Sequence, residues 1–181
     1  GLALSTAASK FGKSAINFTR ASSQYLYAGS FLIGQQPFNV SFWIKFKTSD
    51  SPQRIFSLGT GYSYNSFALH WETGGFQIDG NLVFNWTMDT ASWHHIYISR
   101  SYSPNETRFY IDGVKIGSTY TTITEQNTTA PLYIGCWACA INSFLNAYIN
   151  DFKLEVGSAG YMSDTSFTPP TMPAKGRKGW Y

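Results

Sequence analysis

The stretch Phe38–Lys47 reads FNVSFWIKFK, and every second residue from Phe38 to Phe46 is apolar. This period of two is typical of a β-strand, because successive side chains on a strand point to opposite faces of the sheet. The stretch therefore predicts a half-buried antiparallel strand. The residues expected to face the core are Phe38, Val40, Phe42, Ile44 and Phe46, and those expected to face outward are Asn39, Ser41, Trp43, Lys45 and Lys47.

The same pattern recurs further along the chain. Trp93–Arg100 predicts a second strand, with Ile96 and Ile98 facing inward. Arg108–Ile116 predicts two strands joined by a hairpin turn at Asp112-Gly113, since glycine tolerates the positive φ that tight turns need.

Two further strands, Leu132–Gly135 and Ala147–Val156, complete the strong set, and Asn150 interrupts the alternation as a β-bulge would. No segment longer than two turns has helical periodicity, so we expect an all-β protein with two sheets packed face to face. Weaker strands are expected at Ala15–Phe18, Tyr25–Tyr27, Arg54–Leu58, Phe67–Trp71, Gly75–Ile78 and Leu82–Trp86.

A length of 181 residues fits one domain, and 43% hydrophobic against 13% charged residues excludes wholesale disorder. We place the domain at residues 1–164 and a Pro-rich, basic tail or linker at 165–181. The longest apolar stretch, Ala130–Ile141, is too short to span a bilayer, so no membrane insertion is expected. No basic segment precedes a hydrophobic run at the N-terminus, so no signal peptide is expected either, and the initial Gly1 suggests a piece of a longer chain.

The formal net charge of +3 comes from the tail, where Lys175, Arg177 and Lys178 have no acidic neighbours. The body then holds 10 basic and 10 acidic residues. A neutral body without a basic stripe argues against nucleic acid as a partner.

The two cysteines, Cys136 and Cys139, are separated by only two residues. A zinc site would need two more ligands at suitable spacing, and a redox pair would need a helix that the sequence does not predict here. A small disulfide across a turn and two ordinary thiols both remain open.

Six motifs in order resemble the laminin G-like domains of the concanavalin A-like lectin/glucanase superfamily. They are Ala15–Phe18, Phe42–Lys45, Trp93–Ile98, Phe109–Val114, Leu132–Gly135 and Ile149–Leu154. The following segment, with Phe167-Thr-Pro-Pro170, resembles the end of such domains in bacteriophage tail and virion proteins. The resemblance implies a two-sheet antiparallel jelly roll that binds ligands on its concave face or rim. Most relatives bind glycans or proteins, often with calcium, and a minority hydrolyse glycosides.

The hydrolase branch requires a pair of carboxyl groups about 5–5.5 Å apart in retaining enzymes. The resemblance implies a Glu-x-Asp-x-x-Glu strand, but this chain has no two carboxylates at positions i and i+2. Asp151 and Glu155 on one strand would lie about 13 Å apart. His94 and His95 fit a packing role better than that of a general base. We therefore expect that the protein is not an enzyme.

Binding requires aromatic faces for sugar C–H groups and small polar groups for hydroxyls. The loop 59–66 has this composition and offers Tyr62, Tyr64 and Asn65, although an ordinary surface loop fits it equally well. A second predicted loop, 135–142, offers Asn142 and Trp137, which is either a stacking platform or a lid on the sandwich edge. Two more candidates that end strands, Trp71 and Trp86, are expected either in the ligand site or in the core.

We expect a non-catalytic carbohydrate-binding or adhesion module, outside the cell or on a virion surface, that recognises a host cell-surface glycan or polysaccharide. The alternative is a structural decoration or assembly domain that contacts other virion or tail subunits. Calcium (Ca²⁺) is not firmly predicted, because its candidate oxygen ligands form no dense cluster. These candidates are Asp79, Asn81, Asp89, Asn150 and Asp151.

Overall fold

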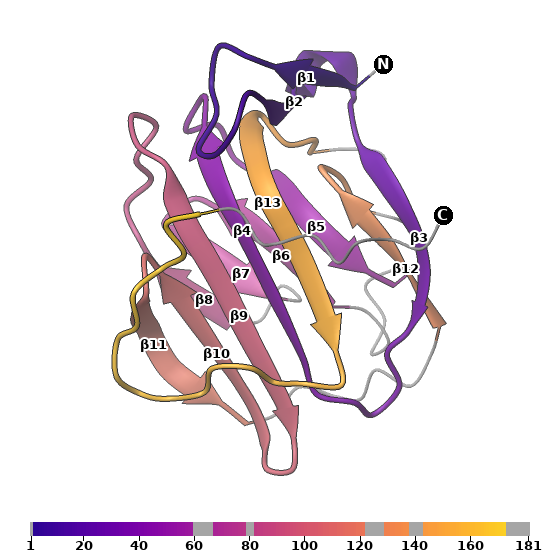
Figure 1. Ribbon diagram of the computed structural model, residues 1–181, viewed down its shortest axis with the longest axis vertical. Coiled ribbons are helices and arrows are strands. Elements are labelled where there is room, and N and C mark those ends of the chain that lie inside the picture. Colours follow the sequence, from indigo (N-terminus) through magenta and orange to yellow (C-terminus); the bar gives the residue numbers. More distant parts are fainter. Residues whose placement is uncertain (1, 60–66, 79–81, 122–128, 138–142, 173–181) are drawn as a thin grey trace.

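Two antiparallel sheets lie face to face in the computed structural model, which describes residues 2–59, 67–78, 82–121, 129–137 and 143–172 (Figure 1). This arrangement confirms the expected all-β jelly-roll sandwich. One sheet contains seven strands in the spatial order β1 (Ala3–Ser5), β2 (Ala15–Phe18), β13 (Ala147–Val156), β4 (Phe38–Phe46), β9 (His94–Tyr102), β10 (Asn105–Ile111) and β11 (Val114–Tyr120). The other contains six in the order β3 (Leu26–Leu32), β12 (Thr129–Ile134), β5 (Gln53–Leu58), β6 (Phe67–Glu72), β7 (Gly75–Ile78) and β8 (Leu82–Asn85).

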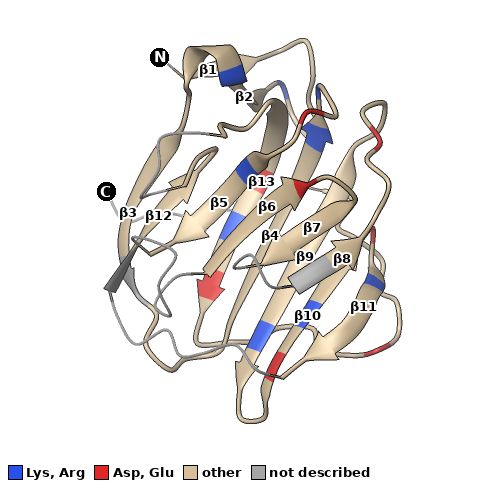
Figure 2. Ribbon diagram, turned by 180° about the vertical axis from the view of Figure 1, so that it is seen from behind, with Lys and Arg blue, Asp and Glu red and all other residues tan. Residues whose placement is uncertain are grey.

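Helical structure in the described residues is limited to one 3₁₀ turn, Arg20–Ser22. Within the same residues, no helix has the length and apolar character needed to span a membrane. In the part of the chain that the structure describes, Lys and Arg are scattered and do not form a stripe over the six-stranded sheet (Figure 2).

The core lies between the sheets and is built from aromatic rings that interlock across them. Phe38 of β4 meets Phe67 of β6 edge-on, with ring centroids 5.0 Å apart, and Phe76 of β7 lies 5.2 Å from Phe109 of β10. Full burial of a side chain of this size stabilises the fold by about 1.5–3 kcal/mol. The five predicted inward residues of β4 are all buried: Phe38, Val40, Phe42, Ile44 and Phe46.

The predicted bulge in β13 is confirmed by its pairing with β4, whose register shifts between Asn150 and Lys153. Asp151 adopts a left-handed backbone conformation there, with φ 55°. The Asn150 side chain accepts a hydrogen bond from the Phe11 amide at 2.8 Å and donates to the Ser14 carbonyl at 3.2 Å. The bulge therefore ties the N-terminal segment to the sheet.

The predicted Asp112-Gly113 turn joins β10 and β11, and both residues have positive φ, 52° and 81°. A side chain at Gly113 would also collide with the chain that passes over the turn, because a Cβ there would lie 1.8 Å from the Phe167 carbonyl oxygen. Glycine is thus required by the turn and by the close approach of this later segment.

The chain after β13, Gly157–Pro170, crosses the outer face of the seven-stranded sheet, and we call it the C-terminal strap (Figure 1). The Phe167 ring lies 5.4 Å from Tyr97 and 5.5 Å from Tyr110, which project from β9 and β10. The Phe167 amide donates to the Gly113 carbonyl at 2.9 Å. Phe167 lies beyond the boundary expected at residue 164, yet it packs on the sandwich.

Candidate functional site

A groove of about 810 Å³ opens at the end of the six-stranded sheet, where β6 turns into β7 and where β8 ends. Two of the predicted ligand-binding residues, Trp71 and Trp86, meet in it with ring centroids 5.9 Å apart and planes at 89°. We call it the Trp71–Trp86 groove. Its other described lining residues are Ser49, Thr73, Gly74, Asn85, Thr87 and Met88.

The strand register explains why the two tryptophans meet. Trp71 pairs with Phe76 across β6 and β7, and Phe76 pairs with Phe84 across β7 and β8. Trp86 follows Phe84 by two residues, and the Trp86 amide donates to the Gly74 carbonyl at 3.4 Å. The hairpin between β6 and β7 thus places both indoles at the same end of the sheet.

The two tryptophans differ in how much of each ring remains available. Trp71 is 5% exposed and packs on Phe46 and Phe76, so it belongs to the core and also forms a wall of the groove. Its Nε1–H is buried and has no hydrogen-bond partner among the described residues. Trp86 is only half-buried, with its ring 5.4 Å from Phe76 and 4.9 Å from His94. Trp86 is therefore the better placed of the two for stacking.

His94 supports the Trp86 ring from a fixed position between two carboxylates. Its Nδ1 lies 2.7 Å from Asp112 Oδ2 and its Nε2 lies 3.2 Å from Asp89 Oδ2. The hydrogen bond to Asp112 raises the pKa of His94, although burial opposes it. Hydrogen bonds from Ser92 and the Ala91 amide lower the pKa of Asp89 to about 2. Both acids and the imidazolium are therefore charged near pH 6, and the ring is held at both nitrogens.

Every described residue that lines the groove is uncharged. The hydroxyls of Ser49, Thr73 and Thr87 and the amide of Asn85 supply both hydrogen-bond donors and acceptors. Such a set suits a neutral, hydroxyl-rich ligand with at least one apolar face.

The sequence profile of the concanavalin A-like lectin/glucanases superfamily matches residues 20–155, well over half of the chain. The chain belongs to this superfamily. The match runs from the 3₁₀ turn nearly to the end of β13, so it covers all strands of the sandwich except β1 and β2.

Solved structures resemble this superfamily member at low sequence identity. Domain 4 of an extracellular arabinanase from Geobacillus stearothermophilus, solved in complex with arabinotriose, has a TM-score of 0.64 and 17% identity over 87% of this chain and 76% of that one. Tailspike protein 2 from an Escherichia coli O157:H7 bacteriophage has a TM-score of 0.66 and 13% identity over 87% of this chain. Domains LG4–5 of the mouse laminin α1 chain have a TM-score of 0.55 and 10% identity, covering 91% and 46% of the two chains.

At these identities the likeness shows the fold alone. The matched region also spans only 25% of the tailspike chain. A sequence comparison with curated proteins found no match.

In this chain, Trp137 does not line the Trp71–Trp86 groove. It is 3% exposed, stacks on His70 with centroids 6.1 Å apart, and lies under the Arg54 guanidinium at 4.5 Å. Burial and the nearby Arg54 lower the pKa of His70 to about 4, so His70 is neutral. Of the two roles considered for Trp137, its burial agrees with that of a lid.

The other predicted site residues, Tyr62, Tyr64, Asn65 and Asn142, lie outside the described residues. The structure therefore places two of the seven candidates, Trp71 and Trp86, together in one groove.

A cluster of three tyrosines, two of them exposed, was not among the predicted site residues. Tyr25 and Tyr27 are 46% and 54% exposed, and their rings lie 6.1 and 5.2 Å from Tyr133. The sequence signal was present, because Tyr25 and Tyr27 stand two apart and so share a face of the expected strand. The contact with Tyr133 depends on the pairing of β12 with β3, which alternation alone does not reveal.

No group of three or more His, Cys, Asp or Glu in the described part of the chain could hold a metal ion. Of the calcium candidates, Asp79 and Asn81 lie outside that part, while Asp89 and Asn150 bond the protein's own groups. Cys136 is a free thiol whose burial raises its pKa to about 11, and Cys139 is not described.

Proposed function

We propose that this domain is a non-catalytic carbohydrate-binding module that holds a neutral saccharide of a cell surface in the Trp71–Trp86 groove. The observation that carries the proposal is the half-buried Trp86 ring among uncharged hydroxyl and amide side chains. Ligand sites generally combine an apolar wall with a few placed polar groups, and a sugar ring offers the matching C–H face and hydroxyls.

The volume and support of the groove favour recognition of one or a few sugar units. A groove of about 810 Å³ lies within the usual range of small-molecule sites, roughly 300–1,000 Å³. The Trp86 ring is held by Phe76, Trp71 and His94, so ligand binding should cost little side-chain conformational entropy.

The same lining supports binding without hydrolysis. Glycosidases of the usual kind need two carboxyl groups beside the scissile bond. None of the described residues that line the groove carries a carboxyl group. Accordingly, incubation with a bound polysaccharide should release no reducing ends.

The setting we propose is host-surface recognition by a phage particle. The fold likeness to a phage tailspike protein and to an arabinanase domain solved with arabinotriose supports a glycan ligand outside the cell. If the domain instead serves assembly, it should bind a virion subunit and show no saturable glycan binding.

The test is calorimetric titration of the wild-type chain and of Trp86→Ala with glycans selected on an array. We expect Trp86→Ala to weaken binding by at least about tenfold, since buried aromatic anchors commonly contribute ~2 kcal/mol and ~1.4 kcal/mol is a factor of ten. Trp86→Phe should lose less, because it keeps a ring in the same place.

Tyr25→Ala is the matched control, as it removes an exposed aromatic ring outside the groove. Thermal unfolding of each variant distinguishes lost binding from lost folding. Unchanged affinity of a folded Trp86→Ala would contradict the proposal.

A further inference from the structure

A second groove, of about 320 Å³, lies between the outer face of the seven-stranded sheet and the C-terminal strap. Its floor comes from three neighbouring strands, β13, β4 and β9, and one wall comes from the strap. We call it the strap groove. The described residues that line it are Asn39, Ser41, His95, Tyr97, Asp151, Lys153, Glu155, Tyr161, Phe167, Thr168 and Pro170.

Hydrogen bonds fix the strap wall in place. The Tyr97 hydroxyl accepts from the Tyr161 amide at 2.7 Å, and the Tyr110 hydroxyl donates to the Ser163 carbonyl at 2.7 Å. Gly160 passes so close to Tyr97 that a Cβ there would lie 2.0 Å from its hydroxyl oxygen. The aromatic wall formed by Tyr161 and Phe167 is thus preformed, with their rings 4.8 Å apart.

The bulge in β13 gives the groove its charged floor. Before the bulge, Ala147 and Ile149 face the core, whereas after it Phe152 and Leu154 pack against the core. One extra residue in a strand reverses which side chains face each way. The bulge therefore turns Asp151, Lys153 and Glu155 toward the outer face, where all three line the groove.

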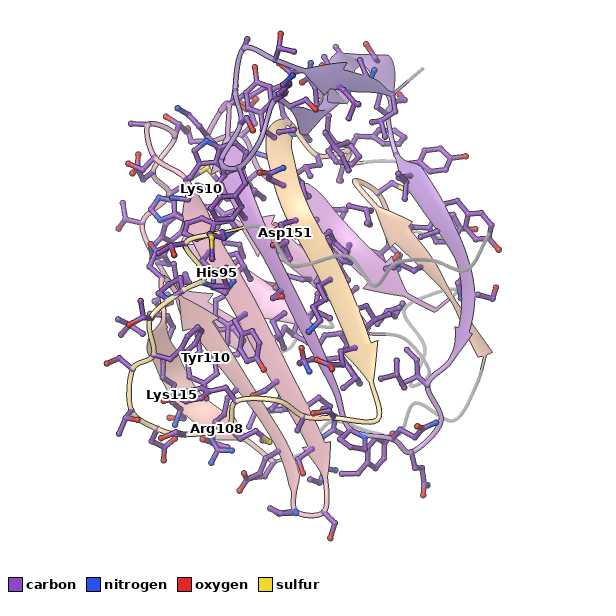
Figure 3. All side chains as sticks on the ribbon, viewed as in Figure 1. Lys10, His95, Arg108, Tyr110, Lys115 and Asp151 are labelled. Atoms are coloured by element: carbon purple, nitrogen blue, oxygen red, sulfur yellow. The ribbon has the colours of Figure 1, made fainter. Side chains whose placement is uncertain are left out.

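His95 adds a buried polar atom to the same floor. The ring is 2% exposed and lies 5.1 Å from Trp43 and 6.0 Å from Phe167. Its Nδ1 is buried and has no hydrogen-bond partner in the part of the chain that the structure describes. Burial lowers the pKa of His95 to about 4, so the ring is neutral near pH 7 and offers one donor and one acceptor. Figure 3 shows His95 on β9 and Asp151 on β13, both on this face, with β4 between the two strands.

Buried polar atoms in proteins nearly always have a partner, so an orphaned ring nitrogen on a residue that lines a groove points to a ligand or water beside that residue. The described lining offers neutral hydroxyls on Ser41 and Thr168 beside the charged side chains. The Glu155 carboxylate is ordered by Asn39 at 3.2 Å and Lys153 at 2.9 Å. With two carboxylates against one ammonium group, the groove disfavours an anion.

We propose that the strap groove is a second saccharide-binding subsite, in which Tyr161 and Phe167 contact the apolar face of one neutral sugar unit while His95 and Asp151 bond its hydroxyls. This inference rests on the proposed function for the class of ligand, but it uses a different face of the sandwich. A chain with two subsites gains avidity on a repeating polysaccharide when both can engage it.

The test is an NMR titration of the full chain with arabinotriose, cellotriose, maltotriose and N,N′-diacetylchitobiose, with choline chloride as a cationic probe. The imidazole signals of His95 and the amide of Tyr161 report on the strap groove, and the Trp86 indole reports on the Trp71–Trp86 groove. We expect saturable shifts at both sets of signals with at least one saccharide.

Asp151→Asn should weaken the His95 and Tyr161 response about tenfold and leave the Trp86 response unchanged, because asparagine tolerates the left-handed backbone at this position. Asp164→Asn is the matched control, since it removes a strap carboxylate that pairs with Arg108 and Lys115 and does not line the groove. It should change neither response.

Shifts at Trp86 without shifts at His95 and Tyr161 would overturn the second subsite and leave the proposed function standing. Shifts at His95 and Tyr161 alone would support the subsite and contradict the first groove. Shifts at neither set would overturn both proposals. A response of the strap groove to choline alone, or one that Asp151→Asn does not weaken, would overturn its assignment to a neutral sugar.

Discussion

At the scale of single residues, the site depends on a few side chains that several contacts hold in place. His94 shows this most clearly, because both of its nitrogens face carboxylates while its ring contacts Trp86. Asp112 serves the turn and the site together: its Oδ1 accepts the His95 amide at 2.8 Å and its Oδ2 faces His94. One residue of a hairpin turn thus helps to position the aromatic wall of the Trp71–Trp86 groove.

The raised pKa of His94 predicts a pH dependence of stability. A group whose pKa is higher in the folded state stabilises the fold fully below its unfolded value, about 6.5, and loses this contribution as the pH rises through the folded value. Asp112→Asn should therefore lower the free energy of unfolding at pH 5.5 more than at pH 8.5. The difference should be at most about 1 kcal/mol, because the Asp112 side chain is 45% exposed and solvent screens the pair.

Urea unfolding at the two pH values measures this difference, and NMR titration of His94 measures its pKa directly. Asparagine accepts the positive φ of residue 112, so the turn itself should survive the change. A His94 pKa at or below 6.5, or an equal loss of stability at both pH values, would contradict this account.

At the scale of elements, the strap adds a layer that strand patterns do not reveal. Phe167 contacts rings on two strands, and its amide bonds the β10–β11 turn. Phe167→Ala should destabilise the protein by about 1–3 kcal/mol, less than the ~3–5 kcal/mol typical of a fully buried Phe, because this side chain is only partly buried. It should also expose the strap to proteases before the sandwich unfolds.

Thermal unfolding and limited proteolysis measure these two effects. Asp164→Asn is a suitable control, since the Asp164 side chain is 68% exposed and contributes ion pairs but no ring contact. Equal stability and equal proteolysis of wild-type and Phe167→Ala would show that the strap is not docked as described.

The strands with strong alternation could be predicted from the sequence, and so could the bulge and the Asp112-Gly113 turn, because each depends on local side-chain patterns. β1 was missed, since three residues at a sheet edge carry too little alternation to detect. Only the last part of the strap, from residue 165, falls in the predicted tail, because Pro169 and Pro170 exclude regular structure, and its docking depends on rings far away in sequence. For the site, strand ends indicated Trp71 and Trp86, but their meeting depends on the register across β7.

At the scale of the whole molecule, the sandwich separates two kinds of surface. One end of the six-stranded sheet carries the uncharged Trp71–Trp86 groove, and the outer face of the seven-stranded sheet carries the strap groove with its mixed charges. The aromatic core between them is buried and interlocked, so exposed residues of either groove can be altered with small cost to the fold, unlike Trp71 and Phe167, whose rings pack on the sandwich. This separation is what makes the two binding proposals independently testable.

The most direct test is a crystal structure of the chain with an oligosaccharide that binds in solution. We predict a sugar ring against the Trp86 indole, with hydroxyls bonded to the groove's Ser, Thr and Asn side chains. A well-ordered sugar bound elsewhere, with the Trp71–Trp86 groove empty at saturating ligand, would contradict the central claim.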